Sequence, residues 1–250
     1  FLVILRRQQR PHIAAGLLFA CVLHLSGPVS ADEPTDHTES QFHHGFSFFG
    51  KLEYPSDFEH FNYTNPDAPI GGDMVLPVVG TFNSFTPWIQ KGINPAGYGF
   101  VGSFIFIFDR VLEPSDDEPS AQYARLGEAI AWAPDYSWFK VRINPKARWH
   151  DGTPITPADL LYTHNFVRKD ATAAIRNALA HIDHAEQTGP LEVTFHISDP
   201  AFRNPSAGLS IGHLPILPAH YWEREENDIT KTTLRPPLGS GPYRIAEFEA

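Results

Sequence analysis

The stretch "WHDGTPITPADLLYTHNF", residues 149–166, contains residue types that can do chemistry. His150 stands beside Asp151, and a histidine next to a carboxylate is the arrangement that general acid–base catalysis and nucleophile activation use. Adjacent residues on a turn point in different directions, however, and the sequence implies no nucleophile nearby. We therefore predict that this pair shapes a turn and that the chain has no catalytic residues.

The residues that follow the turn have structural explanations. Thr156 is a typical N-cap, Pro157 suits the first position of a helix, and Asp159 falls in the first turn, where the helix dipole favours a carboxylate. Leu160 and His164 share one face of the predicted helix, so we expect the His164 ring to be partly buried in the packing.

Carboxylates elsewhere offer an alternative function. Asp116 and Asp117, or Asp135, would serve as the acid pair of a secreted hydrolase acting on peptides or glycans. Such a pair must lie about 5 to 10 Å apart across a cleft, which the sequence alone does not show. Binding without catalysis is the preferred interpretation.

Two further patterns resemble binding sites. "GYGFVG" at residues 97–102 matches a G-x-G-x-x-G pattern, but a proline-containing loop precedes it where a dinucleotide site needs a strand. "HIDH" places His181 and His184 three residues apart, which suits a metal site on a helix. The same residues also fit a hairpin that turns at Gly189-Pro190, where the two histidines would face opposite ways. We predict no metal site and no cofactor.

Composition excludes one class of partner. The formal net charge is −10 over 250 residues, and no basic stripe follows any periodic segment. Nucleic acid is therefore not an expected partner.

The first residues have the order of a secretory signal peptide. Arg6, Arg7 and Arg10 precede an apolar run, and small residues precede Asp32. We predict a signal peptide over residues 1–31 and a polar linker over residues 32–44. Cys21, which follows a small residue, leaves lipid anchoring as the alternative.

Strand and helix patterns alternate along the rest of the chain. Alternating apolar and polar residues predict strands at residues 137–144, 191–198 and 243–249, and residues 73–80 read as a mostly buried strand. Residues 103–112 are too short an apolar run to assign to strand or helix. The chain is predicted to be α/β.

The stretch "WFKVRINPKARWHDGTPITPADLLYTHNF" resembles the signature region of the family 5 extracellular solute-binding proteins. Further stretches follow in the family's order: "LEVTFHISDP", "LPILPAHYW" and "PPLGSGPYRIAEFE". The earlier stretch "HGFSFFGKLEYPSDFEHFNYTNPDAPIGGDM" is similar to the subgroup that binds oligopeptides and microcin C type peptides.

This resemblance implies a lobe of a type II periplasmic binding protein with mixed sheets. The first part of lobe I would span residues 45–85, an inserted smaller α/β subdomain residues 86–205, and the return into lobe I residues 206–250, with the second lobe absent from this chain. It also implies a monomeric periplasmic receptor, not an enzyme, that delivers peptides to the permease subunits of an ABC transporter in the inner membrane.

The resemblance places ligand contacts after the first buried strand, in "GTFNSFTPW". Asn83 and Ser84 would hydrogen-bond a peptide main chain, and Phe82, Phe85 and Trp88 would stack on its side chains. Phe85 and Trp88 are equally compatible with a place in the core.

Overall fold

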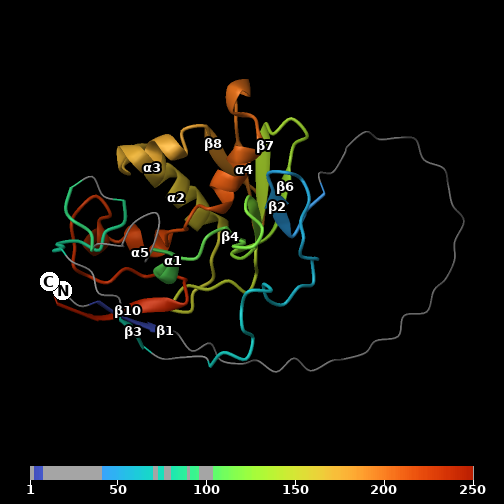
Figure 1. Cartoon of the computed structure of the whole chain (residues 1–250). Coiled ribbons are helices and arrows are strands. Elements are labelled where there is room, and N and C mark those ends of the chain that lie inside the picture. The colour runs from blue at the N-terminus through green and yellow to red at the C-terminus, as the bar shows by residue number, and fades with distance from the viewer. Residues whose placement is uncertain are drawn as a thin grey trace, which may run out of the picture.

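A computed structural model describes residues 3–7, 41–69, 73–75, 80–88, 91–95 and 104–249 (Figure 1). The nucleotide-like pattern at residues 97–102, residues 8–40 of the predicted signal peptide and linker, and residues 76–79 of a predicted strand lie outside this description. None of the helices in the described ranges has the length and apolar character that crossing a membrane requires.

An antiparallel sheet of four strands forms the centre of the molecule. Its order is β6-β7-β9-β8, with bounds β6 Gly127–Trp132, β7 Trp138–Ile143, β9 Glu192–His196 and β8 His184–Gly189. The predicted strands at residues 137–144 and 191–198 are confirmed, as is the hairpin that turns after Gly189. Along β7 the side chains alternate between half-buried and buried, so one face of the sheet is apolar.

Helices cover that apolar face. They are α2 Pro157–Lys169, α3 Ala173–Ala178 and α4 Pro205–Gly212 (Figure 1). The His164 ring of α2 lies 6.2 Å from that of Phe195 on β9. On α4, a Cβ added to Gly208 would lie 2.5 Å from the Phe139 ring of β7, so this helix approaches the sheet at a residue without a side chain.

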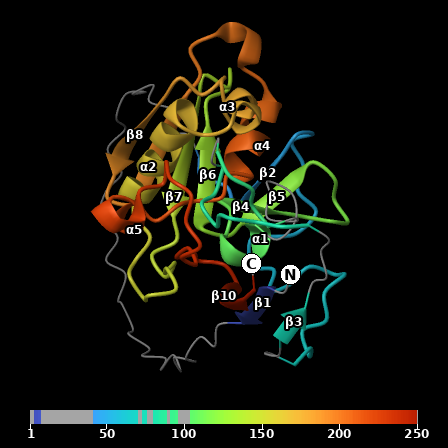
Figure 2. The same cartoon turned by 90° about the vertical axis from the view of Figure 1, so that its left-hand side faces the viewer.

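Two smaller sheets flank the centre. One has the order β2-β5-β4, with bounds β2 Gly45–Ser47, β5 Ala121–Ala124 and β4 Leu112–Pro114. The other has the order β10-β1-β3, with bounds β10 Tyr243–Phe248, β1 Val3–Arg7 and β3 Asp73–Val75. Figures 1 and 2 show the second sheet at the end of the molecule opposite α3. The predicted strand near residue 245 is confirmed as β10.

Short helices complete the described chain. They are α1 Phe104–Ile107, α5 Ala219–Trp222 and the 3₁₀ turns Pro200–Phe202 and Glu225–Asn227. The ambiguous segment of residues 103–112 is thus a helical turn that leads into β4. Buried side chains from Phe46 to Ile245 form one continuous main core, with a satellite cluster around Tyr54 and Tyr123. The mixed α/β class is confirmed, and the predicted domain boundaries stay a prediction.

Candidate functional site

The loop of residues 80–95 contains the predicted ligand-binding residues. Its aromatic side chains are buried: Phe82 is 5% exposed, Phe85 0% and Trp88 5%. The Phe85 ring meets Phe248 edge-on with centroids 4.9 Å apart, and Trp88 stacks on Phe166 at 6.4 Å. This burial favours the packing alternative for the aromatic residues, and their contact with a ligand stays a prediction.

The polar residues of the loop differ from each other in exposure. Asn83 is exposed, and its Oδ1 accepts a hydrogen bond of 2.8 Å from the Ile93 backbone. Ser84 is fully buried, and its Oγ accepts from the backbone N–H groups of Thr86 at 3.0 Å and Thr233 at 3.3 Å. Among the predicted contacts, Asn83 alone has an exposed side chain.

The loop is held in an unusual backbone conformation. Trp88 has a φ of 53°, which a bulky residue rarely adopts. Its carbonyl accepts a 2.9 Å hydrogen bond from the Thr172 N–H, and the Phe85 N–H donates to the Thr233 carbonyl at 2.6 Å. Strained conformations fixed by their surroundings are common where a protein contacts a ligand.

His150 links the motif before α2 to the "GSGPY" stretch, residues 239–243, through two hydrogen bonds. Its backbone N–H donates to the Gly239 carbonyl at 2.8 Å, and its ring Nε2 lies 2.8 Å from the Gly241 carbonyl, to which it donates. A Cβ on Gly239 would lie 2.0 Å from the Ile107 carbonyl oxygen, so this close approach requires glycine. These contacts agree with a structural role for His150, which stays a prediction.

Asp151 points to different partners from those of His150. Its Oδ1 accepts from the Thr153 N–H at 3.0 Å and hydroxyl at 2.7 Å, and its Oδ2 lies 2.9 Å from the His220 Nε2. Partial burial would raise the pKa of Asp151, but the hydrogen bonds from His220 and Thr153 outweigh burial and lower it. The adjacent His150 and Asp151 thus do not form a pair.

Asp159, in the first turn of α2, accepts hydrogen bonds from several parts of the chain. It is 3% exposed, and its Oδ1 accepts from the Ala219 N–H at 2.8 Å. Its Oδ2 accepts from the Thr156 N–H at 2.8 Å and lies 3.4 Å from the indole Nε1 of Trp149. Thr156 is the N-cap as predicted, and the Asp159 carboxylate closes the reciprocal capping contact.

His164 lies inside the packing, as predicted. It is 4% exposed, and burial lowers its pKa. A buried imidazole packed against Phe195 is a core residue and is badly placed for proton transfer to a bound molecule.

The carboxylates of the hydrolase alternative have local partners. Asp117 accepts hydrogen bonds from the hydroxyls of Tyr54 and Ser115. Asp135 accepts from Ser137 on the same turn and from Arg203 at 3.2 Å. These contacts give both carboxylates roles in holding turns.

A recess of about 360 Å³ lies between residues 44–64 and the strands β4 and β5. Aromatic and charged side chains share its wall, which is formed by His44, Ser56, Phe58, Glu59, His60, Phe61, Thr64, Glu113, Ala124 and Arg125. Burial raises the pKa of Glu113, and Arg125 pairs with Asp109 at 2.8 Å. The sequence does not predict this recess, because its walls come from segments far apart in the chain.

The mixed sheets, the helices on one face and the braced loops define a lobe of a solute-binding protein. Residues 105–250 match the bacterial extracellular solute-binding proteins, family 5 Middle, and the chain belongs to that family. The resemblance deduced from the sequence is confirmed. The family is one of binding proteins rather than enzymes, and its extracellular assignment implies export.

Curated relatives match most of the chain. It is 38% identical over 212 residues to the uncharacterized protein y4wM of Sinorhizobium fredii, a match that covers 83% of this chain and 31% of the relative. It is 35% identical to the peptidoglycan-binding protein YepA of Agrobacterium fabrum, covering 81% of this chain and 33% of the relative. For the probable peptide-binding protein YejA of the same organism the identity is 33%, with 81% and 32% covered. The chain spans about a third of the length of these relatives.

A solved structure shares the fold. The oligopeptide-binding protein AppA of Bacillus subtilis, in complex with a nonapeptide, superposes with a TM-score of 0.51 at 17% identity. The match covers 68% of this chain and 32% of AppA.

Proposed function

We propose that the chain is part of a periplasmic receptor that captures peptides and delivers them to an ABC import permease. The family match over residues 105–250 carries this proposal. Two relatives with at least 33% identity, whose names describe binding of peptides and of peptidoglycan, support the peptide as ligand. The receptor acts as a monomer, without a cofactor.

The loop of residues 80–95 supplies main-chain recognition. Asn83 is exposed beside Phe82 and Ser84, both of which are buried. Its Oδ1 is engaged by Ile93, so its amide Nδ2 is the group that donates to a peptide carbonyl. The hydrogen bond from the Phe85 N–H to the Thr233 carbonyl holds the loop in place before the ligand arrives. This reduces the entropy lost on binding.

Identification of the bound ligand tests the proposal. A protein with the length of the relatives is purified without denaturation, and the small molecules released on unfolding are identified by mass spectrometry. Intact peptides that rebind in calorimetry support peptide capture. Peptidoglycan fragments in place of ordinary peptides would change the ligand class, and cleaved peptides would favour the hydrolase.

A pair of variants tests the Asn83 contact. Asn83→Asp keeps the Oδ1 that Ile93 uses but removes the amide donor, so peptide affinity should fall about tenfold, or about 1.4 kcal/mol, at unchanged melting temperature. Thr81→Ala alters an exposed neighbour and should leave affinity unchanged. Equal affinities in all three proteins would remove Asn83 from the site.

We further propose that export removes residues 1–31, so the mature chain begins at Asp32. In the described structure Val3–Arg7 form β1 between β10 and β3, and this cleavage would take β1 out of that sheet. Intact-mass measurement of the exported protein tests the proposal. A lipid on Cys21 would contradict it and indicate a membrane anchor instead.

A further inference from the structure

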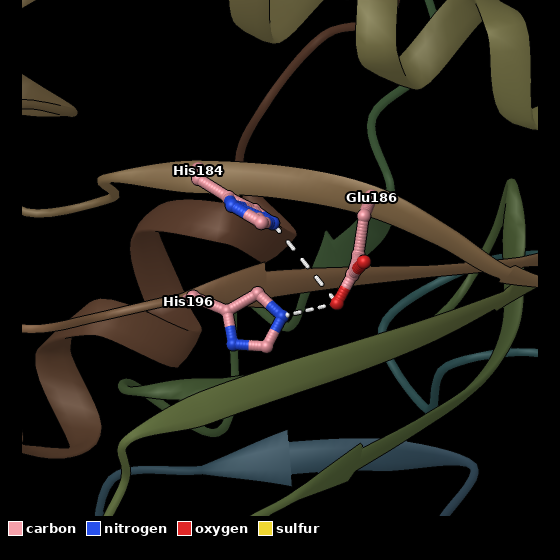
Figure 3. Close-up of side chains that lie close together, drawn as sticks. All are labelled: His184, Glu186 and His196. Atoms are coloured by element: carbon pink, nitrogen blue, oxygen red, sulfur yellow. Dashed lines mark hydrogen bonds and ion pairs between the residues drawn. The ribbon is translucent and has the colours of Figure 1, made fainter.

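Three side chains with metal-ligand chemistry meet on the outer face of the β8–β9 hairpin. His184 on β8 is the direct register partner of His196 on β9. Glu186 lies two residues along β8 and therefore projects from the same face as His184. Figure 3 shows the two imidazoles and the carboxylate pointing toward one another.

The distances are close to those of a metal site. The Glu186 Oε1 lies 2.9 Å from the His196 Nε2 and 4.0 Å from the His184 Nε2. One ligand atom from each residue fits within 4.8 Å of the others. Donor atoms around a tetrahedral zinc ion lie roughly 3.3 Å apart. Small side-chain rotations close the difference, because His184 is 54% exposed, Glu186 50% and His196 34%.

A further carboxylate stands next to the cluster in the chain. Asp183 precedes His184, and its carboxylate accepts a hydrogen bond from the Ser198 N–H. The cluster also contributes little to the fold, because an exposed ion pair is worth about 0 to 1 kcal/mol.

We propose that His184, Glu186 and His196 bind one divalent first-row transition ion, with Zn²⁺ as the probe that defines the site. Two imidazole nitrogens and one carboxylate oxygen suit zinc, nickel or copper, whereas calcium and magnesium prefer oxygen ligands alone. The ion takes the place of the hydrogen bond between the His196 Nε2 and the Glu186 Oε1, and water completes its coordination on the solvent side. This site is separate from the loop of residues 80–95 and does not depend on peptide binding.

Calorimetry on the full chain, purified without a histidine tag, tests the site. We expect Zn²⁺ to bind with a stoichiometry of one, and Ca²⁺ not to bind. His184→Ala and His196→Ala should each weaken Zn²⁺ binding by at least about tenfold, since even the loss of a residue that only supports a metal ligand costs 10- to 100-fold. Because His184 is exposed and His196 is half-buried at the surface, the variants should keep the wild-type circular dichroism spectrum.

His220 provides the matched control. Its Nε2 lies 2.9 Å from the Asp151 Oδ2, and the two side chains are 33% and 35% exposed, but this pair has no second imidazole among the described residues. His220→Ala should therefore leave Zn²⁺ affinity within about twofold of wild type. A loss in His220→Ala equal to that in His196→Ala would show scattered binding to surface histidines and overturn the proposal. Wild-type protein that binds no Zn²⁺ would overturn it as well.

Discussion

At the start of α2 the Asp159 carboxylate is buried and bonds mainly to the backbone, whereas on the outer face of the β8–β9 hairpin the Glu186 carboxylate is exposed and contacts two imidazoles. Asp159 accepts from the backbone N–H groups of Thr156 and Ala219. Glu186 has the imidazoles of His184 and His196 as its partners. Both regions look equally reactive in the sequence, since each combines histidine with a carboxylate.

This difference distinguishes carboxylates that hold the fold from carboxylates that can bind a ligand. A buried carboxylate that accepts hydrogen bonds from backbone N–H groups cannot move away, because those N–H groups would stay buried without an acceptor. Its position is therefore fixed. An exposed carboxylate between two imidazoles loses little when its partners change, because water replaces them. The partners of a polar side chain therefore indicate its role better than its residue type does.

The largest effect is expected from Asp159→Ala. The substitution leaves the buried N–H groups of Thr156 and Ala219 without their acceptor, so the free energy of unfolding should fall by about 3 to 5 kcal/mol. Urea unfolding measures this loss. Asp151→Ala, in the same motif but more exposed, should cost less than about 1 kcal/mol; equal costs would mean that burial of the carboxylate does not set the loss of stability.

A smaller loss is expected on mild acidification. Burial lowers the pKa values of His164, His181 and His213 in the folded chain. Below the ordinary histidine pKa of about 6.5 the unfolded chain therefore binds more protons, and stability falls as the pH falls. The raised pKa of Glu113 acts in the opposite direction.

A variant isolates the histidine contribution. His164→Gln cannot take up charge, so its urea midpoint should drop less than that of wild type between pH 7.5 and pH 5.5. An identical drop in both proteins would mean that His164 does not contribute to this dependence.

His150→Ala should have a modest effect. It removes the ring hydrogen bond to the Gly241 carbonyl, which is worth about 1 kcal/mol, while the backbone bond to Gly239 remains. Ligand affinity in a protein of the relatives' length should stay within about tenfold of wild type. A hundredfold loss of affinity at an unchanged melting temperature would place His150 in contact with ligand.

The smallest effect is expected on the hairpin face. Without metal, His196→Ala and Glu186→Gln should each change the free energy of unfolding by less than about 0.5 kcal/mol, as is usual for exposed sites. Excess Zn²⁺ should raise the melting temperature of wild type but not of these variants, since a ligand that binds the folded state stabilises it. A large loss without metal would make the cluster structural, like Asp159.

Local patterns in the sequence predict much of the fold. The alternation in "SWFKVRIN" and "LEVTFHIS" leads to β7 and β9, and the cap at Thr156 marks the start of α2. These features depend on residues that are neighbours in the chain, so propensity and periodicity suffice. The segment of residues 103–112 was ambiguous because a short apolar run suits both a helical turn and a strand.

The candidate sites depend on distant contacts, so the sequence predicts them less well. Phe85 and Trp88 are aromatic, and both a core and a ligand cleft favour aromatic residues. The hairpin cluster depends on strand register. An irregularity between Gln187 and Gly189 determines which residue of β8 pairs with which residue of β9. A slip of one residue would move Glu186 to the other face, and the sequence does not show where the shift occurs.

The join between the "GSGPY" stretch and the end of α1 has a consequence for folding kinetics. The N–H groups of Ser240 and Gly241 donate to the Ile107 carbonyl at 3.0 and 2.8 Å, and the Asp109 N–H donates to the Ser240 hydroxyl across 131 positions of the chain. Closing so long a loop costs chain entropy before any contact repays it, and such contacts slow folding. The central sheet lies within this loop and closes shorter loops, so we expect it to form first. The amide hydrogens of Ser240 and Gly241 then become protected late in refolding, after those of β7 and β9.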